Sequence, residues 1–150
     1  MMEYQGQWDK TEVADFLEES TIPIRLSFIS SDDKPWMLSL WYQFQDGELI
    51  CATEKNANVV QHLTERPYCA FEISTNEAPY KGVRGKGDVT IEPDEEFQQL
   101  RQLVDRYIGT EETSFREWLL GRDVEEVKIR IQPEKIYSWD YSDRMKELSE

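Results

Sequence analysis

The chain has 150 residues and a mass of 17.8 kDa, a length typical of one folded domain. It carries 31 acidic and 17 basic residues, so its formal net charge is −14. This charge disfavours binding to nucleic-acid backbones and to anionic membrane surfaces. Aromatic residues make up 12% of the chain, too many for a disordered acidic segment. We therefore expect one domain over residues 1–150 with an acidic surface, a composition also typical of proteins adapted to high salt.

Several functional classes lack their sequence signatures. No run approaches the roughly 20 apolar residues of a membrane span, and the first residues lack the basic and apolar regions of a signal peptide. Cys51 and Cys69 are too few for a disulfide framework. The sequence has no zinc or calcium motif, and His62 is its one histidine. We therefore expect a cytoplasmic protein with reduced thiols, no metal site and no catalytic side chain.

Hydrophobic periodicity and turn residues predict strands that mostly follow each other directly, with helices between some of them. Asp46-Gly47 is typical of a tight hairpin turn. Residues 1–9 and 144–150 are expected to be flexible ends. The expected elements are a helix from the cap Asp9 or Thr11 to Ile22, strands over 24–30, 36–44 and 48–53, a helix over 56–66, strands over 68–74 and 80–91, helices over 95–108 and 114–120, and strands over 124–131 and 135–141.

A basic segment stands out in this acidic chain. Residues 79–87 contain Lys81, Arg84 and Lys86 and no acidic residue. On a strand, alternation places Arg84 and Lys86 on the same face. The glycines of this segment indicate a bulge or a close approach of another backbone. Two cations on one face suit an anionic ligand, although cations on a strand can also pair with neighbouring carboxylates.

A second candidate anion site joins a strand end to a helix start. Thr53, Lys55 and Asn58 lie there, where free backbone N–H groups of a helix N-terminus attract phosphate. Capping of the helix by Asn56 or Asn58 is the alternative interpretation. Aromatic residues crowd the strands over 36–44 and 135–141, which indicates a core, a dimer interface or a surface on which a flat ligand stacks.

In order and spacing, these segments resemble the pyridoxamine 5′-phosphate oxidase-like flavin-binding split barrels. The resemblance covers residues 10–145, and no single motif in it is diagnostic. The segments that carry it are 24–28, 35–42 and 46–53 for the opening strands, 58–63 and 66–71 for the short helix and fourth strand, 80–87 for the long fifth strand, and 136–140 for the closing strand.

The resemblance implies a mainly β fold, a six-stranded antiparallel Greek-key split barrel with peripheral helices. It also implies a homodimer that binds FMN at its interface, whereas other members of the family bind a deazaflavin coenzyme or haem. Many relatives carry a lysine where this chain has Asn58. By position, Arg25 would lie near the flavin phosphate or ring, Ser39, Leu40 and Trp41 would line the ring, Thr53, Lys55 and Asn58 would hold the phosphate with added charge from Arg84 and Lys86, and Trp139 would close the pocket from the partner chain.

The sequence hypothesis is thus an FMN-dependent oxidoreductase that transfers a hydride between the flavin and an unidentified small-molecule substrate. The cofactor would supply the chemistry, which agrees with the absence of a catalytic triad. Three alternatives remain open at this point. One is a deazaflavin-dependent reductase of the same fold, whose longer acidic coenzyme would need extra cations. Another is a dimer that binds flavin or haem without catalysis. The third is an interaction domain whose pocket is vestigial.

Overall fold

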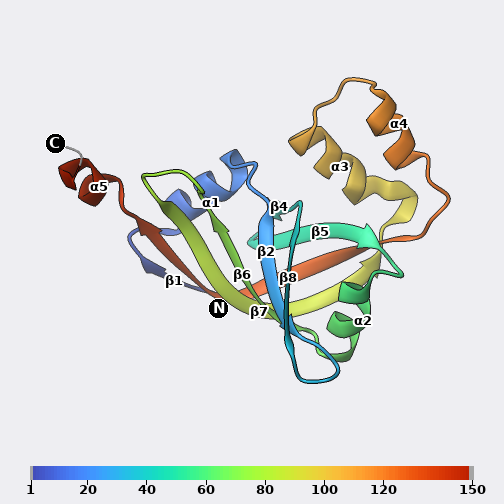
Figure 1. The fold of residues 1–150 in the computed structure, drawn as a ribbon, viewed down its shortest axis with the longest axis horizontal. Helices are drawn as coiled ribbons and strands as arrows, with labels where there is room; N and C mark the ends of the chain where they lie inside the picture. The colour runs from blue at the N-terminus through green and yellow to red at the C-terminus, as the bar shows by residue number, and fades with distance from the viewer. Residues whose placement is uncertain (1, 149–150) are drawn as a thin grey trace.

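The computed structural model describes residues 2–148 and consists of one mostly antiparallel sheet with helices around it (Figure 1). The strands are β1 Glu3–Gly6, β2 Ile24–Ile29, β3 Pro35–Leu40, β4 Gln43–Gln45, β5 Glu48–Glu54, β6 Tyr68–Ser74, β7 Lys81–Pro93 and β8 Glu126–Asp140. The helices are α1 Lys10–Glu19, α2 Asn58–Glu65, α3 Gln98–Tyr107, α4 Ser114–Leu120 and α5 Ser142–Leu148, with a short 3₁₀ turn over Glu95–Phe97. The mainly β fold with peripheral helices is therefore confirmed.

The strand order is β3-β2-β6-β7-β8-β5-β4, and β1 pairs with β8 beside this path. The pair β1–β8 is parallel, and the other pairs are antiparallel. Among the described residues, β3 and β4 form the two ends of the path and do not pair with each other, so the sheet is open. It has eight strands instead of the six that the resemblance implied.

Strand β8 is the longest, with 15 residues, and it contacts three other strands. One edge of β8 pairs with β7, from Lys81↔Asp140 to Pro93↔Val127. The other edge pairs with β5 in its first half and with β1 in its second half. The predicted bulge is confirmed, since the β7–β8 register shifts between Lys86 and Gly87.

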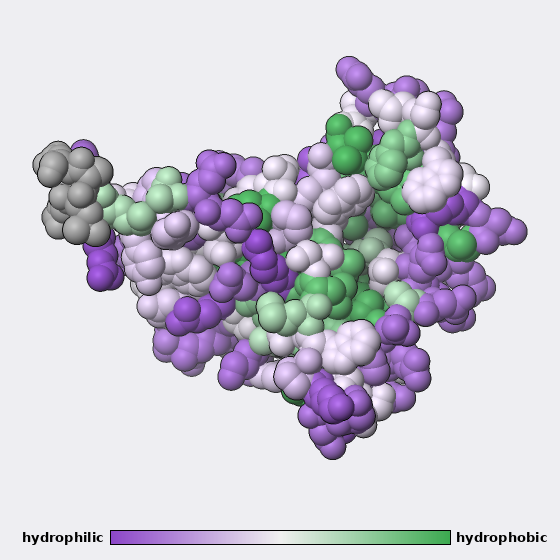
Figure 2. Space-filling view, viewed as in Figure 1, coloured by the Kyte–Doolittle hydropathy of each residue, from purple (hydrophilic) through white to green (hydrophobic). Residues whose placement is uncertain are grey.

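The hydrophobic core lies between the inner face of the sheet and helices α1 and α2. Alternate residues of β2, β6 and β8 are buried, as the period of two predicted. Tyr42 is fully buried, and its hydroxyl donates to the backbone oxygen of Leu17 at 2.8 Å. This bond ties the chain between β3 and β4 to helix α1. Figure 2 shows hydrophobic side chains near α3 and α4 and over the middle of the sheet, with hydrophilic residues around them.

Two predicted strand boundaries were wrong. The predicted strand over 36–44 is divided, because β3 pairs with β2 whereas β4 pairs with β5 at the other end of the sheet. The predicted strands over 124–131 and 135–141 are one continuous strand, β8. Pro133 lies at its bulge, opposite Gly87, a place where a strand tolerates a residue without a backbone N–H.

The helix predicted over 95–108 begins later, at Gln98. Glu96 and Phe97 both have a φ of 56°, in the left-handed region, which interrupts the helix before its first regular turn. Asp94 still acts as a cap, since its carboxylate accepts the backbone N–H groups of Gln99 and Leu100 at 2.8 and 3.0 Å. The predicted helix over 114–120 is confirmed as α4, and its N-cap Thr113 accepts from the backbone N–H of Arg116.

Regular structure also forms at both ends of the chain, where the sequence indicated flexible segments. Residues Glu3–Gly6 form β1, and Ser142–Leu148 form α5. Residues 1, 149 and 150 lie outside the described residues. In the part of the chain that the structure describes, no helix combines the length and the apolar character needed to cross a membrane.

Gly6 lies where β1 approaches the backbone of β8 closely enough to exclude a side chain. Its φ is +96°, and a Cβ placed on it would collide with the backbone carbonyl of Ser138. We predict that Gly6→Ala lowers the free energy of unfolding by about 2 kcal/mol or more, measured by urea denaturation. Gly109→Ala is the control, because Gly109 also has a positive φ but has no atom within 4 Å of its added Cβ. Equal losses in the two variants would contradict the close approach.

Candidate functional site

A pocket of about 550 Å³ opens on the outer face of β2, β6, β7 and β8. Its volume lies within the range typical of small-molecule sites. We call it the basic pocket, because four cations line it. The cations are Arg25, Arg84, Lys86 and Lys135, and the apolar or aromatic side chains Met37, Tyr68 and Tyr137 lie among them.

Strand register brings these cations together. In the strand register, Arg25 of β2 lies opposite Glu72 of β6, and Glu72 lies opposite Arg84 of β7. Two residues further along, Lys86 lies directly opposite Lys135 across β7 and β8. Because side chains two residues apart share one face, both rows point to the same side of the sheet. The prediction that Arg84 and Lys86 lie on one face is confirmed.

The four cations form no ion pair with a carboxylate of the described residues. Two acidic residues line the pocket, and each is bonded to a hydroxyl instead. Glu72 accepts from Ser74 at 2.9 Å, and Glu134 accepts from Tyr68 at 3.2 Å. Arg84 and Lys86 therefore do not form ion pairs with neighbouring carboxylates, in contrast to the alternative interpretation of this segment.

Arg25 has one buried nitrogen without a partner. Its Nη2 donates to Asn76 Oδ1 at 3.0 Å, whereas its Nη1 is buried and makes no hydrogen bond to a described residue. Leaving a charged donor unsatisfied costs folding free energy, on the order of 1–3 kcal/mol. An anionic ligand in the basic pocket would remove this cost, so the residues present fit a phosphate-bearing cofactor.

Aromatic rings hold Arg84 in place. Its guanidinium carbon lies 4.5 Å from the ring centre of Tyr137 and 5.4 Å from that of Trp139. The two rings are themselves stacked, with centres 6.4 Å apart. Cation–π contacts of this kind orient a guanidinium without neutralising its charge. Trp139 thus supports the basic pocket through Arg84, in the same chain.

The three predicted ring-lining residues are not among those that line this pocket. Ser39 is opposite Arg25 in the pairing of β3 with β2. Leu40 is half-buried against the hydrophobic core. Trp41 stacks on Tyr107 of α3, with ring centres 5.3 Å apart and planes 9° from parallel. Packing therefore occupies Leu40 and one face of Trp41.

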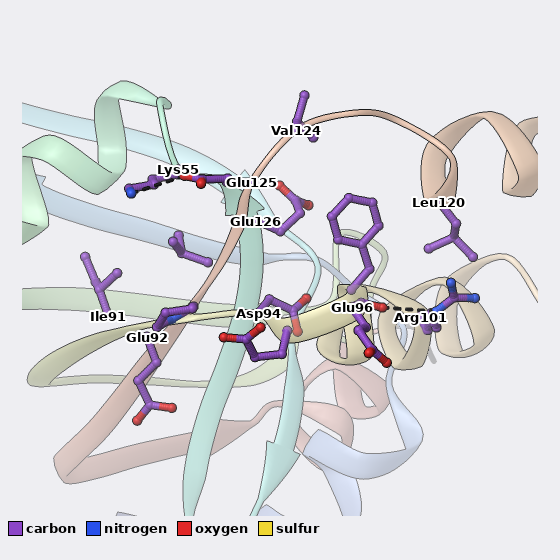
Figure 3. A pocket seen from close by; sticks show the side chains of 14 residues that line it. Lys55, Ile91, Glu92, Asp94, Glu96, Arg101, Leu120, Val124, Glu125 and Glu126 are labelled. Atoms are coloured by element: carbon purple, nitrogen blue, oxygen red, sulfur yellow. Dashed lines mark hydrogen bonds and ion pairs between the residues drawn. The ribbon is translucent and has the colours of Figure 1, made fainter.

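The residues predicted from the strand–helix junction are remote from the basic pocket. Thr53 pairs with Val127 of β8, whereas Arg84 pairs with Tyr137 of the same strand, up to roughly 33 Å away at ~3.3 Å per residue. Lys55 bonds to Glu125 at 3.1 Å and lines a different pocket (Figure 3). Within one chain, the predicted anion site at the strand–helix junction is therefore separate from the basic pocket.

Helix α2 starts at Asn58 with Ala57 as its N-cap, and no side chain caps it. The alternative of capping by Asn56 or Asn58 is therefore not what the structure shows.

Sequence reasoning missed Lys135, Met37 and Tyr68 as members of the basic pocket. Alternation along the predicted strand over 135–141 places Lys135 on the same face as Tyr137, so this cation could have been found. Met37 and Tyr68 belong to β3 and β6, and only the strand order brings them beside β7.

The remaining chemistry-bearing residues lie elsewhere. Cys51 and Cys69 are unbonded and buried in the core, and burial raises the pKa of both thiols, that of Cys69 to about 12. They are neutral at physiological pH.

His62 packs against Trp36 with ring centres 5.1 Å apart, and its Nδ1 is 3.2 Å from the Ser31 hydroxyl. No cluster of three or more possible metal ligands occurs among the described residues.

No protein-family profile and no curated protein sequence matches the chain. Solved structures do match it. The conserved hypothetical protein Rv2991 from Mycobacterium tuberculosis aligns with a TM-score of 0.76 and 24% identity over 91% of this chain and 88% of that one. An F420 reductase aligns with a TM-score of 0.63 and 21% identity over 81% and 94%. A proposed pyridoxamine 5′-phosphate oxidase from Listeria innocua aligns with a TM-score of 0.63 and 16% identity over 84% and 94%.

The chain has the split-barrel fold of the pyridoxamine 5′-phosphate oxidase-like proteins. The fold that the sequence resemblance implied is thereby confirmed. At 16 to 24% identity, these three structures show a shared fold and assign no activity to this chain.

The opposed lysines of the basic pocket should reduce stability. Because like charges directly opposite each other destabilise a strand pair, we predict that Lys86→Gln raises the unfolding midpoint at low salt by about 1–3 °C. The gain should disappear near about 1 M NaCl, where the charges are screened. Lys10→Gln, on α1, is the control for the change in net charge. A lower midpoint for Lys86→Gln than for this control would contradict the repulsion.

Proposed function

We propose that this protein is a flavin-dependent oxidoreductase that binds FMN in the basic pocket. One observation carries the proposal. Four cations, Arg25, Arg84, Lys86 and Lys135, converge without carboxylate partners in a chain of net charge −14, and a nitrogen of Arg25 is buried and unsatisfied. The split-barrel fold is shared with a protein named as FAD-binding, which supports a flavin as the anionic ligand.

The residues of the pocket suit the two parts of such a cofactor. Arg25 and Arg84 can each bind phosphate oxygens through two parallel N–H bonds, and Lys86 adds a point charge. Met37 and Tyr68 offer apolar area for a flat ring. When bound, the flavin supplies hydride transfer, and the chain contributes binding and orientation. The substrate in this proposal is a small molecule of unidentified structure.

A homodimer is part of the proposal. Met37 is 70% exposed and Tyr68 41% exposed, so apolar surface remains uncovered at the pocket rim. Thr53, Lys55 and Asn58 lie far from the basic pocket of their own chain. A second copy could cover the rim and bring these residues toward the phosphate. Cytoplasmic location remains a proposal that rests on the sequence.

A deazaflavin coenzyme is the second candidate. Lys86 and Lys135 extend the positive row beyond the two arginines, which would suit a longer acidic tail. Haem fits less well, because His62, the one histidine of the chain, lies outside the residues that line the basic pocket.

The decisive test is FMN binding by the purified chain and by a variant with Arg84→Ala and Lys86→Ala. We predict that the double variant binds FMN at least about tenfold more weakly at fixed salt, since two charge-assisted contacts are lost. Flavin fluorescence measures the affinity. The control carries Lys10→Ala and Lys34→Ala, which remove the same charge outside the pocket. Equal affinity of the double variant and this control would contradict the proposed site.

Competition distinguishes the cofactors. Displacement of FMN by the deazaflavin coenzyme at lower concentration would favour the second candidate. Bound FMN that neither NADH nor NADPH reduces, and that gives no turnover with quinones or oxygen, would support a non-catalytic flavin-binding protein instead. Failure to bind either cofactor would contradict both candidates and leave haem to be tested.

A further inference from the structure

A second pocket, of about 930 Å³, lies where β7 ends and β8 begins, beside α3, α4 and the loop before α2 (Figure 3). We call it the acidic pocket. Six carboxylate side chains line it, and only two cations, Lys55 and Arg101, accompany them. Apolar side chains such as Leu120 and Val124 form much of the remaining wall. The six acidic residues are Glu92, Asp94, Glu95, Glu96, Glu125 and Glu126.

Several of these carboxylates already have partners within the protein. Glu125 pairs with Lys55 at 3.1 Å, and Glu92 pairs with Lys128 at 3.6 Å. Asp94 accepts two backbone N–H bonds at the start of α3. The acidic composition of the pocket by itself therefore does not define a ligand site.

Glu126 is the exception, because it is buried and only partly satisfied. The residue is 5% exposed, and its Oε1 lies 3.4 Å from Nη2 of Arg122. Its Oε2 is buried and has no hydrogen-bond partner among the described residues. Arg122 is shared, since it also bonds to Glu54 at 2.5 Å. A buried carboxylate oxygen that accepts no hydrogen bond is unfavourable. A ligand in this pocket that donates a hydrogen bond to Glu126 would remove that cost.

Phe97 adds an aromatic ring to the same pocket. Its backbone has a φ of 56°, and Glu96 before it has the same value. Two consecutive residues other than glycine in this region cost folding free energy, and such strain concentrates at functional sites. Phe97 lines the pocket in spite of this strain, and the face of its ring attracts cations.

We propose that the acidic pocket binds an organic cation, a protonated amine with an apolar body. The ammonium group donates to Oε2 of Glu126, and the apolar body packs against Phe97 and Leu120. Val127 lines this pocket and Lys135 lines the basic pocket, up to roughly 26 Å apart along β8. The amine site is therefore separate from the proposed flavin site of the same chain.

The probe is 2-phenylethylammonium, titrated into the full chain at pH 7 by calorimetry. The uncharged 2-phenylethanol has the same ring and chain and serves as the matched ligand control. We expect the ammonium to bind saturably and at least about tenfold more tightly than the alcohol, because only the ammonium forms a charged hydrogen bond with Glu126. Equal binding of the two ligands, or no binding of the ammonium up to about 10 mM, would overturn the proposal.

Glu126→Gln tests the residue that carries the charge. We expect this variant to bind 2-phenylethylammonium at least about tenfold more weakly. Glu77→Gln, in the exposed loop between β6 and β7, changes net charge equally and should stay within about twofold of the parent. Burial raises the pKa of Glu126. Glutamine keeps the shape of the side chain, so the variant should still fold, and its unfolding midpoint is measured beside its affinity.

Phe97→Gly provides a second variant that the fold should accept. Glycine adopts a φ of 56° freely, so the change relieves strain while it removes the ring. We expect weaker binding of 2-phenylethylammonium without loss of stability. Unchanged affinity in both Glu126→Gln and Phe97→Gly would overturn the proposed site even if the parent binds the probe elsewhere.

Discussion

The pairing of β7 with β8 is the interaction on which the rest of the structure depends. It runs from Lys81↔Asp140 to Pro93↔Val127, and β8 then carries β5 and β1 on its other edge. Gly85 allows this approach, because a Cβ there would lie 2.5 Å from the backbone oxygen of Lys135. The two pockets lie toward opposite ends of the same strand pair, so one ladder positions both.

Both candidate sites include interactions that are unfavourable in the free protein. In the basic pocket, Lys86 faces Lys135, and a nitrogen of Arg25 is unsatisfied. In the acidic pocket, Glu126 is buried with one oxygen unpaired, and Phe97 is held at a positive φ. A ligand of the opposite charge would offset the charge repulsion and satisfy the unpaired polar atoms, and its binding would stabilise the fold by mass action. Such local costs are typical of sites whose geometry is prepared for a ligand.

The charge distribution separates the two sites. The chain is strongly acidic, so an anionic ligand is repelled by most of its surface. The basic pocket is a local exception on the outer face of the sheet, and its cations are not neutralised by the described carboxylates. The acidic pocket follows the overall charge, and its single unsatisfied carboxylate oxygen distinguishes it from an ordinary acidic surface. One chain thus offers complementary surfaces to ligands of both signs.

The sequence by itself determined most of the local elements, because strand alternation, the Asp46-Gly47 turn and the Asp94 cap act over a few residues. The split-barrel fold was implied by the resemblance in segment order and spacing, and the structure confirms it. It also identified the shared face of Arg84 and Lys86, which follows from the period of two. Only the tertiary structure decided which residues form each site. Strand order placed Arg25, which the resemblance had already indicated, beside Arg84 and Lys86, and it added Lys135. It also separated Thr53 and Lys55 from the basic pocket and left Glu126 buried with one oxygen unsatisfied. These outcomes depend on pairings between segments far apart in the chain, for which a single sequence carries no periodic signal.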